Sequence, residues 1–167
     1  MAASPPADER PTKVLFVCLG NICRSPTAHG VFQAMVDEAG FTDRIQVSSA
    51  GTGGWHVGDP PHDDAVRHAD RRGYDLSRLR ARQVKPSDLA DADLVLAMDR
   101  SNLENLRRMA APADQAKVQL FLDFAPEQPL REVPDPYGGG AAGFERVLDL
   151  VEEAARGLLK HLQAMRR

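Results

Sequence analysis

Hydrophobic and polar positions come in blocks along the chain. The first block is a short apolar run at residues 14–17, of the kind expected for a strand buried on both faces. Apolar residues then recur with helical spacing at Ala28, Val31, Phe32, Met35 and Ala39. Ser25 is a favoured N-cap and Pro26 suits the first helical position, so a helix is predicted to begin at Ser25 and end near Gly40.

The same two periods predict the remaining elements. Three further strands are expected at residues 45–49, 93–98 and 117–121. Helices are expected at 61–72, at 101–106 and, along one apolar face, at 144–162. The stretch 123–142 is rich in proline and glycine and predicts a long loop. Strands that alternate with helices indicate a single α/β domain around a parallel sheet.

Composition narrows the class of protein. The chain has 167 residues and a formal net charge of −3, which suits one domain and gives no reason to expect nucleic acid as a partner. No apolar run is long enough for a membrane-spanning helix. Residues 1–12 lack the apolar core of a signal peptide and are predicted to be a disordered leader before a domain at 13–167. A cytoplasmic location follows by default, and signal-independent secretion stays open.

Cysteine and histidine usage argues against a metal. The two cysteines, at positions 18 and 23, form no disulfide framework of a secreted protein, and their spacing matches no zinc site. The spacings of His56, His62 and His68 repeat no ligand pattern, and acidic residues surround them. We interpret these histidines as part of a solvated helix face and expect neither a metal nor a cofactor.

The loop at residues 18–24 carries the strongest chemical signal. A strand end and a helix N-terminus direct several N–H groups at one point, and such a cradle binds an oxyanion such as phosphate. Cys18 ends the strand, where its thiolate would be stabilised by the helix dipole and by the Arg24 cation, whose planar fork also matches two phosphate oxygens. Gly20 and Asn21 tolerate the positive φ of a closed loop, and Ser25 lies close enough in sequence to hydrogen-bond the sulfur.

A Cys-x5-Arg pattern alone would favour two buried structural thiols in an ordinary turn. Strand, loop residues and Ser-Pro helix start agree here on one geometry, which favours a nucleophile in an anion-binding loop.

The second chemical signal is Asp135, which stands between two prolines in the long loop. Loops at the carboxyl ends of parallel strands converge on one crevice, so Asp135 could reach Cys18 and protonate a leaving group. Alone, an Asp-Pro pair would favour a simple turn. Trp55 lies in a glycine-rich loop, which favours display for contact, with a plug at the edge of the core as the alternative.

The segments CLGNICRSP, LAMDRSNLENL and DPY resemble the low-molecular-weight protein tyrosine phosphatases, from Lys13 to about Leu162. The resemblance implies a four-stranded parallel sheet, order 2-1-3-4, with helices on both faces and the phosphate-binding loop between strand 1 and helix 1. It also implies Cys18 as nucleophile, Arg24 as phosphate-binding residue and Asp135 as general acid. Asn21 and Ser25 would hold the loop and the thiolate, and Trp55 and Tyr137 would wall an aryl pocket. The remaining loop residues are Leu19, Gly20, Ile22 and Cys23.

The implied activity is hydrolysis of protein phosphotyrosine and aryl phosphates through a phosphocysteine, in a monomer whose substrates could include a bacterial tyrosine kinase. Cys23 would be a redox partner of Cys18, because the closed loop folds the two positions toward each other and family members share the pair. The chain departs from the family at Gly138, where many members have a second tyrosine, and at Arg78, where some have a histidine behind the loop. The leader is also longer than the family needs.

Two other function classes are weighed against this one. Arsenate reductases of the thiol-relay class need downstream cysteines, and none follows Cys23. A non-catalytic phosphotyrosine-binding module would be expected to lack Cys18, Arg24 or Asp135, and all three are present. Within the phosphatases, the arginine-phosphate branch typically has threonine at the position of Ile22, so the apolar residue favours phosphotyrosine.

Overall fold

The centre of the fold is a four-stranded sheet in which every pair of neighbouring strands is parallel. The computed structural model describes residues 10–137 and 139–165. Its strand order, β2-β1-β3-β4, confirms the predicted topology. The strands are β1 (Thr12–Cys18), β2 (Ile45–Gly51), β3 (Leu94–Ala97) and β4 (Val118–Leu120). β1 therefore begins at Thr12, the last residue of the predicted leader, whose residues 1–9 lie outside the described residues.

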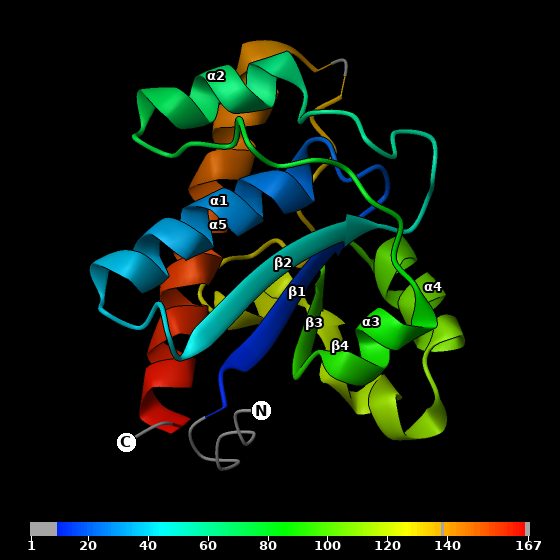
Figure 1. The fold of residues 1–167 in the computed structure, drawn as a ribbon. Coiled ribbons are helices and arrows are strands. Elements are labelled where there is room, and N and C mark those ends of the chain that lie inside the picture. Colours follow the sequence, from blue (N-terminus) through cyan, green and yellow to red (C-terminus); the bar gives the residue numbers. More distant parts are fainter. Residues whose placement is uncertain (1–9, 138, 166–167) are drawn as a thin grey trace, which may run out of the picture.

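Helices cover both faces of the sheet (Figure 1). On one side lie α1 (Arg24–Glu38), α2 (Asp63–Arg71) and the long α5 (Gly140–Met165). On the other side lie α3 (Pro86–Asp91) and α4 (Arg100–Met109). The chain also forms two 3₁₀ helices, η1 (Pro112–Lys117) and η2 (Phe121–Phe124). The sequence pattern does not predict α3, η1 or η2, because elements of six residues or fewer show no helical period. Within the described residues no helix is long and apolar enough to cross a membrane.

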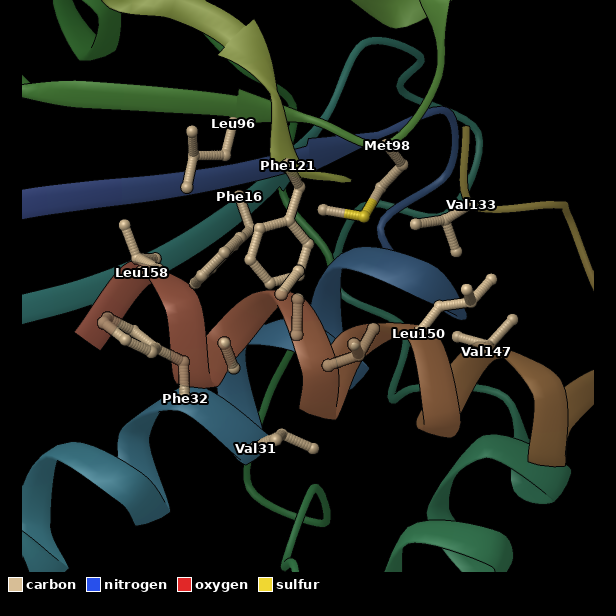
Figure 2. Close-up of a cluster of buried hydrophobic side chains, with 14 of the residues drawn as sticks. Phe16, Val31, Phe32, Leu96, Met98, Phe121, Val133, Val147, Leu150 and Leu158 are labelled. Carbon is tan, nitrogen blue, oxygen red and sulfur yellow. The ribbon is translucent and has the colours of Figure 1, made fainter. Parts of the chain in front are cut away.

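The apolar run that opens the chain is buried on both faces, as predicted. Val14 and Phe16 of β1 belong to the cluster under α1 and α5, whereas Leu15 and Val17 belong to the cluster under α3 and α4. The ring of Phe16 meets Phe32 and Phe121 edge-on at centroid distances of 5.8 and 4.9 Å, at the centre of the cluster in Figure 2. Burial of residues 14–18 of this strand fixes its register, and thereby fixes the place where Cys18 leaves the sheet.

The start of α1 differs from the prediction. The N-cap is Cys23, whose side chain makes no capping hydrogen bond, and the helix already includes Arg24, so Ser25 as N-cap was wrong. The Ser25 hydroxyl is fully buried and lies instead 3.0 Å from the sulfur of Cys18. The preference of serine for N-caps assumes that its hydroxyl is available to the helix, and here the loop between β1 and α1 engages that hydroxyl.

Candidate active site

The loop between β1 and α1 turns through an unusual backbone conformation at Asn21. Its φ of 56° makes it the only non-glycine residue with positive φ among those the structure describes. Its side-chain Nδ2 donates to the Ser25 hydroxyl at 2.8 Å, and its Oδ1 accepts from the backbone N–H of Arg82 at 3.0 Å. These bonds stabilise a conformation that asparagine tolerates better than most residues. The exposed Arg78 does not supply this support, which comes from the backbone of Arg82.

The sulfur of Cys18 lies at the centre of the loop. The backbone N–H of Asn21 donates to it at 3.3 Å, and the Ser25 oxygen lies 3.0 Å away. That oxygen also accepts from the Asn21 amide, and its single proton can go either to the sulfur or to the Ala50 carbonyl oxygen at 3.4 Å. Both contacts place a hydrogen-bonding group directly beside the sulfur.

The end of β2 closes the loop from the other side. The carbonyls of Cys18 and Leu19 accept hydrogen bonds from the N–H groups of Thr52 and Gly53, each at 2.9 Å. A Cβ at Gly51 would stand 2.7 Å from the Leu19 oxygen, so only glycine allows this close approach. In the sequence, Gly51 is recognisable as a glycine near the end of the second strand. Its contact with the loop after Cys18 is not recognisable there.

Arg24 is held by residues far away in the chain. Its side chain is 4% exposed, and its Nη1 donates to the Asp99 carboxylate at 2.7 Å and to the Val133 carbonyl at 3.0 Å. Asp99 in turn caps α4 through the N–H of Asn102 at 2.8 Å. Both bonds come from Nη1, and together they hold the guanidinium in one orientation. In the sequence, Asp99 is recognisable as an acidic residue between a buried strand and a helix. Nothing in that position identifies Arg24 as its partner.

Asp135 approaches the same guanidinium from the acid loop, defined here as residues 132–137. One carboxylate oxygen lies 4.0 Å from Arg24 Nη2, and the other accepts from the N–H of Tyr137 at 3.0 Å. The side chain is 50% exposed, which leaves it accessible to a substrate. A cavity of about 240 Å³ brings Cys18, Arg24 and Asp135 together, as the sequence predicts.

Two exposed aromatic residues stand on the rim of this cavity. Trp55 is 73% exposed and Tyr137 is 65% exposed, so Trp55 does not plug the edge of the core. His56 also lines the cavity and was missed as a site residue, since nothing in its sequence context indicates the loop beside it. Of the predicted loop residues, Leu19, Gly20, Ile22 and Cys23 line the cavity. Asn21 and Ser25 support it from behind.

The three histidines do not share one solvated face. His68 is buried, with its ring stacked on Phe144 and its Nδ1 2.5 Å from the Glu145 carboxylate, so that interpretation is wrong for His68. Acidic neighbours in sequence suggested exposure, but α5 covers this residue of α2. His62 packs edge-on against Tyr137, with ring centroids 5.7 Å apart. In the part of the chain that the structure describes, no group of three or more His, Cys, Asp or Glu residues is arranged to hold a metal ion.

Cys23 is a buried thiol of the cavity wall. Its burial raises its pKa to about 12, with further contributions from the negative charges of Asp135 and Cys18. At neutral pH Cys23 is therefore protonated.

Comparison with known proteins decides the family. The family profile described as low molecular weight phosphotyrosine protein phosphatase matches residues 13–167. The chain belongs to this family. A low molecular weight protein-tyrosine-phosphatase of Streptomyces coelicolor is 47% identical over 152 residues, which are 88% of this chain and 91% of the relative. YfkJ of Bacillus subtilis, of the same description, is 41% identical over 150 residues, 90% of this chain and 95% of its own.

Solved structures agree with this assignment. The crystal structure of YfkJ superposes with a TM-score of 0.89 at 39% identity, covering 94% of this chain and 98% of that one. A protein tyrosine phosphatase from Entamoeba histolytica gives the same TM-score at 35% identity, covering 93% of this chain. As a member of the low molecular weight family, the chain is a protein-tyrosine phosphatase.

Proposed function

We propose that the chain hydrolyses protein phosphotyrosine in two steps, with Cys18 as nucleophile, Arg24 as phosphate-binding residue and Asp135 as general acid and base. The backbone N–H groups of the loop from Leu19 to Ser25 bind the phosphate oxygens, together with the guanidinium of Arg24. The cavity around Cys18 is small enough for a phosphate group and opens toward the two aromatic side chains.

In the first step, the Cys18 thiolate forms a bond to phosphorus while the bond from phosphorus to the tyrosine oxygen breaks. The leaving phenoxide takes a proton from the carboxyl group of Asp135. Charge on the transferring phosphoryl group is stabilised by Arg24, whose orientation Asp99 and Val133 fix before substrate binds.

In the second step, Asp135 takes a proton from water, and the water oxygen attacks phosphorus. The sulfur–phosphorus bond breaks, which regenerates the Cys18 thiolate and releases inorganic phosphate. The half-exposed position of Asp135 suits a group that must meet both a phenol oxygen and a water molecule.

The observation that supports this proposal most is the convergence of Cys18, Arg24 and Asp135 on one cavity, although Asp135 is remote from the others in sequence. The test compares wild type, Cys18→Ser and Asp135→Asn on a phosphotyrosine peptide. Cys18→Ser should lose turnover and still bind inorganic phosphate, because the N–H cradle remains. Substantial turnover by Cys18→Ser would overturn the assignment.

Asp135→Asn should slow phosphotyrosine hydrolysis by about 10²–10⁴-fold, and the deficit should shrink for aryl phosphates with better leaving groups. An equal deficit for all leaving groups would remove Asp135 from the role of general acid.

Tyrosine-phosphorylated proteins are the proposed substrate class. Trp55 and Tyr137 can enclose a phenyl ring, which phosphoserine lacks, and Ile22 presents an apolar side chain to the cavity. Trp55→Ala should therefore raise KM for phosphotyrosine peptides more than for a small phosphate ester. Equal effects on both would mean that Trp55 does not contact the phenyl ring.

A further inference from the structure

A second hollow lies behind the acid loop and shares no residue with the active-site cavity. We call it the basic groove, and its volume is about 680 Å³, within the range of ligand sites. Its apolar lining is formed by Pro129, Leu130 and Pro134. Its charged lining consists of Arg100, Arg131, Glu132 and Arg146, so arginines outnumber acids three to one.

The two outer arginines are available to a ligand. The side chain of Arg100, at the start of α4, is 61% exposed and lies 3.7 Å from Glu132. Arg146, on α5, is exposed, and no hydrogen bond or ion pair of its guanidinium is found within the described residues. Glu132 alone does not neutralise this pair of cations.

Arg131 has a different place in the groove. Its guanidinium donates to the carbonyls of Leu122 and Ala125 at 3.1 and 3.0 Å, and also to that of Gln128. A carboxylate of Asp123 lies 3.7 Å away. Arg131 therefore fixes the loop that forms the groove wall, and it adds positive charge without a free edge for a ligand.

The groove adjoins the residues that hold Arg24. The backbone N–H of Arg100 donates to the Glu132 carboxylate at 2.9 Å, and each of these residues is next in sequence to an Arg24 partner, Asp99 or Val133. Val133 itself is anchored in the core, with its N–H bonded to the Met98 carbonyl at 2.8 Å and its side chain near Met98 in Figure 2. A ligand in the groove would thus bind to rigidly held chain close to the catalytic site.

We propose that the basic groove binds an acidic segment of the phosphoprotein substrate, at a distance in sequence from its phosphotyrosine; this rests on the proposed function. Carboxylates of the segment pair with Arg100 and Arg146, and an apolar side chain packs on Leu130 and the two prolines. An open hollow flanked by cations with an apolar floor fits an extended peptide with alternating acidic and apolar residues.

The test uses two phosphotyrosine peptides that differ only in a distal segment, Glu-Leu repeats in one and Gln-Leu repeats in the other. Both carry flexible Gly-Ser linkers in a series of about 4 to 12 residues, because the segment must reach the groove. With wild type, KM should be about three- to tenfold lower for the glutamate peptide at the best linker length, since two exposed ion pairs contribute a modest binding energy. This advantage should decrease with added salt.

Arg146→Glu should abolish the preference while hydrolysis of a small aryl phosphate stays unchanged. Arg156→Glu is the matched control, because it makes the same charge change at an exposed position of α5 outside the groove lining, and it should keep the preference. Equal KM values for the two peptides with wild type, or the same loss in both variants, would overturn the proposal. Failure of wild type to hydrolyse either peptide would count against the proposed function instead.

Discussion

The guanidinium of Arg24 and the carboxylate of Asp99 form an ion pair of 2.7 Å at the base of the active-site cavity. Arg24 is almost fully buried, whereas Asp99 is partly exposed and also caps α4. One carboxylate therefore orients the guanidinium of Arg24 and caps the start of α4. Removal of either partner should affect both the stability of the fold and the binding of phosphate.

We expect Asp99→Ala to lower the free energy of unfolding on the order of 3 kcal/mol, because it leaves the Arg24 charge buried without its counterion and removes an N-cap. Asp99→Asn keeps an acceptor for Arg24 and a cap for α4, so its loss should be smaller. Urea unfolding measures the stability, and the inhibition constant of inorganic phosphate measures the orientation of Arg24. Equal stability of the two variants would show that the cap and the acceptor oxygen contribute little.

His62 connects three parts of the site. Its backbone N–H donates to the Ile22 carbonyl at 2.8 Å, its ring lies against Tyr137, and its Nδ1 caps α2 by accepting from the N–H of Asp64 at 3.0 Å. The same ring also meets Phe144 of α5, at a centroid distance of 5.2 Å. His62 is therefore placed to position Tyr137 at the cavity.

Two substitutions separate these roles. His62→Asn retains a capping side chain and loses the ring contact, so KM for a phosphotyrosine peptide should rise about two- to tenfold. His62→Phe retains the ring and loses the cap, so it should keep KM and lose about 1 kcal/mol of stability. Inhibition by inorganic phosphate, which does not reach Tyr137, should stay unchanged in both. A KM that rises equally in both variants would contradict positioning by the ring.

Local sequence patterns predict the part of the site that is local in the chain. The apolar run before Cys18, the permissive Asn21 and the helical spacing that follows predict the strand, the loop and the helix, although not the residue at which the helix begins. The partners of Arg24 are 75 and 109 positions away, and no periodicity identifies them.

Ser25 and His68 show the same limit. A free serine before a helix is a good N-cap, yet the closed loop uses this hydroxyl for the sulfur of Cys18. His68 has polar neighbours in sequence, yet Phe144 and Glu145 of α5 cover it. Glu145 lies 77 positions away from His68 in the chain. Tertiary contacts of this kind override the local preference of a residue for a cap or for an exposed position. Local sequence patterns do not reveal such contacts.

His29 should make stability depend on pH. Burial, and then the positive charge of Arg82, lower its pKa to about 4 from an ordinary value of 6.5. The unfolded chain therefore binds a proton between these values that the folded chain does not. The contribution of neutral His29 is complete above about pH 6.5 and is lost as pH falls toward 4, by at most about 1.4 kcal/mol per pH unit.

The variant His29→Gln removes this titration and can still hydrogen-bond Ser49, which lies 3.0 Å from Nδ1. Urea unfolding of both proteins at several pH values between 4.5 and 7 isolates the effect, because all other groups titrate in both. Wild type should lose more stability than the variant over this range. Parallel pH profiles would show that His29 is accessible to protons in the folded state.

Under oxidation, we expect Cys23 to protect Cys18 from irreversible damage. Peroxide transfers an oxygen to the Cys18 thiolate and forms a sulfenic acid. The Cys23 thiolate then attacks that sulfur, a disulfide forms, and the sulfenic oxygen leaves as water after taking up protons. Both thiols line one cavity, and a dithiol reductant would restore them. After peroxide and then reductant, wild type should regain most activity and Cys23→Ser much less, whereas equal recovery would leave Cys23 with a packing role only.

The raised pKa of Cys23 sets the pH dependence of this protection. Because the thiol has a pKa of about 12, its thiolate fraction, and so the rate of disulfide formation, should rise up to about tenfold per pH unit between pH 7 and 9. The negative charge of Asp135 contributes to that pKa, so Asp135→Asn should form the disulfide faster than wild type at the same pH. The rate is measured by trapping free thiols at intervals after a peroxide pulse. A slower reaction in Asp135→Asn would mean that Asp135 assists the exchange as a base, and it would contradict the electrostatic account.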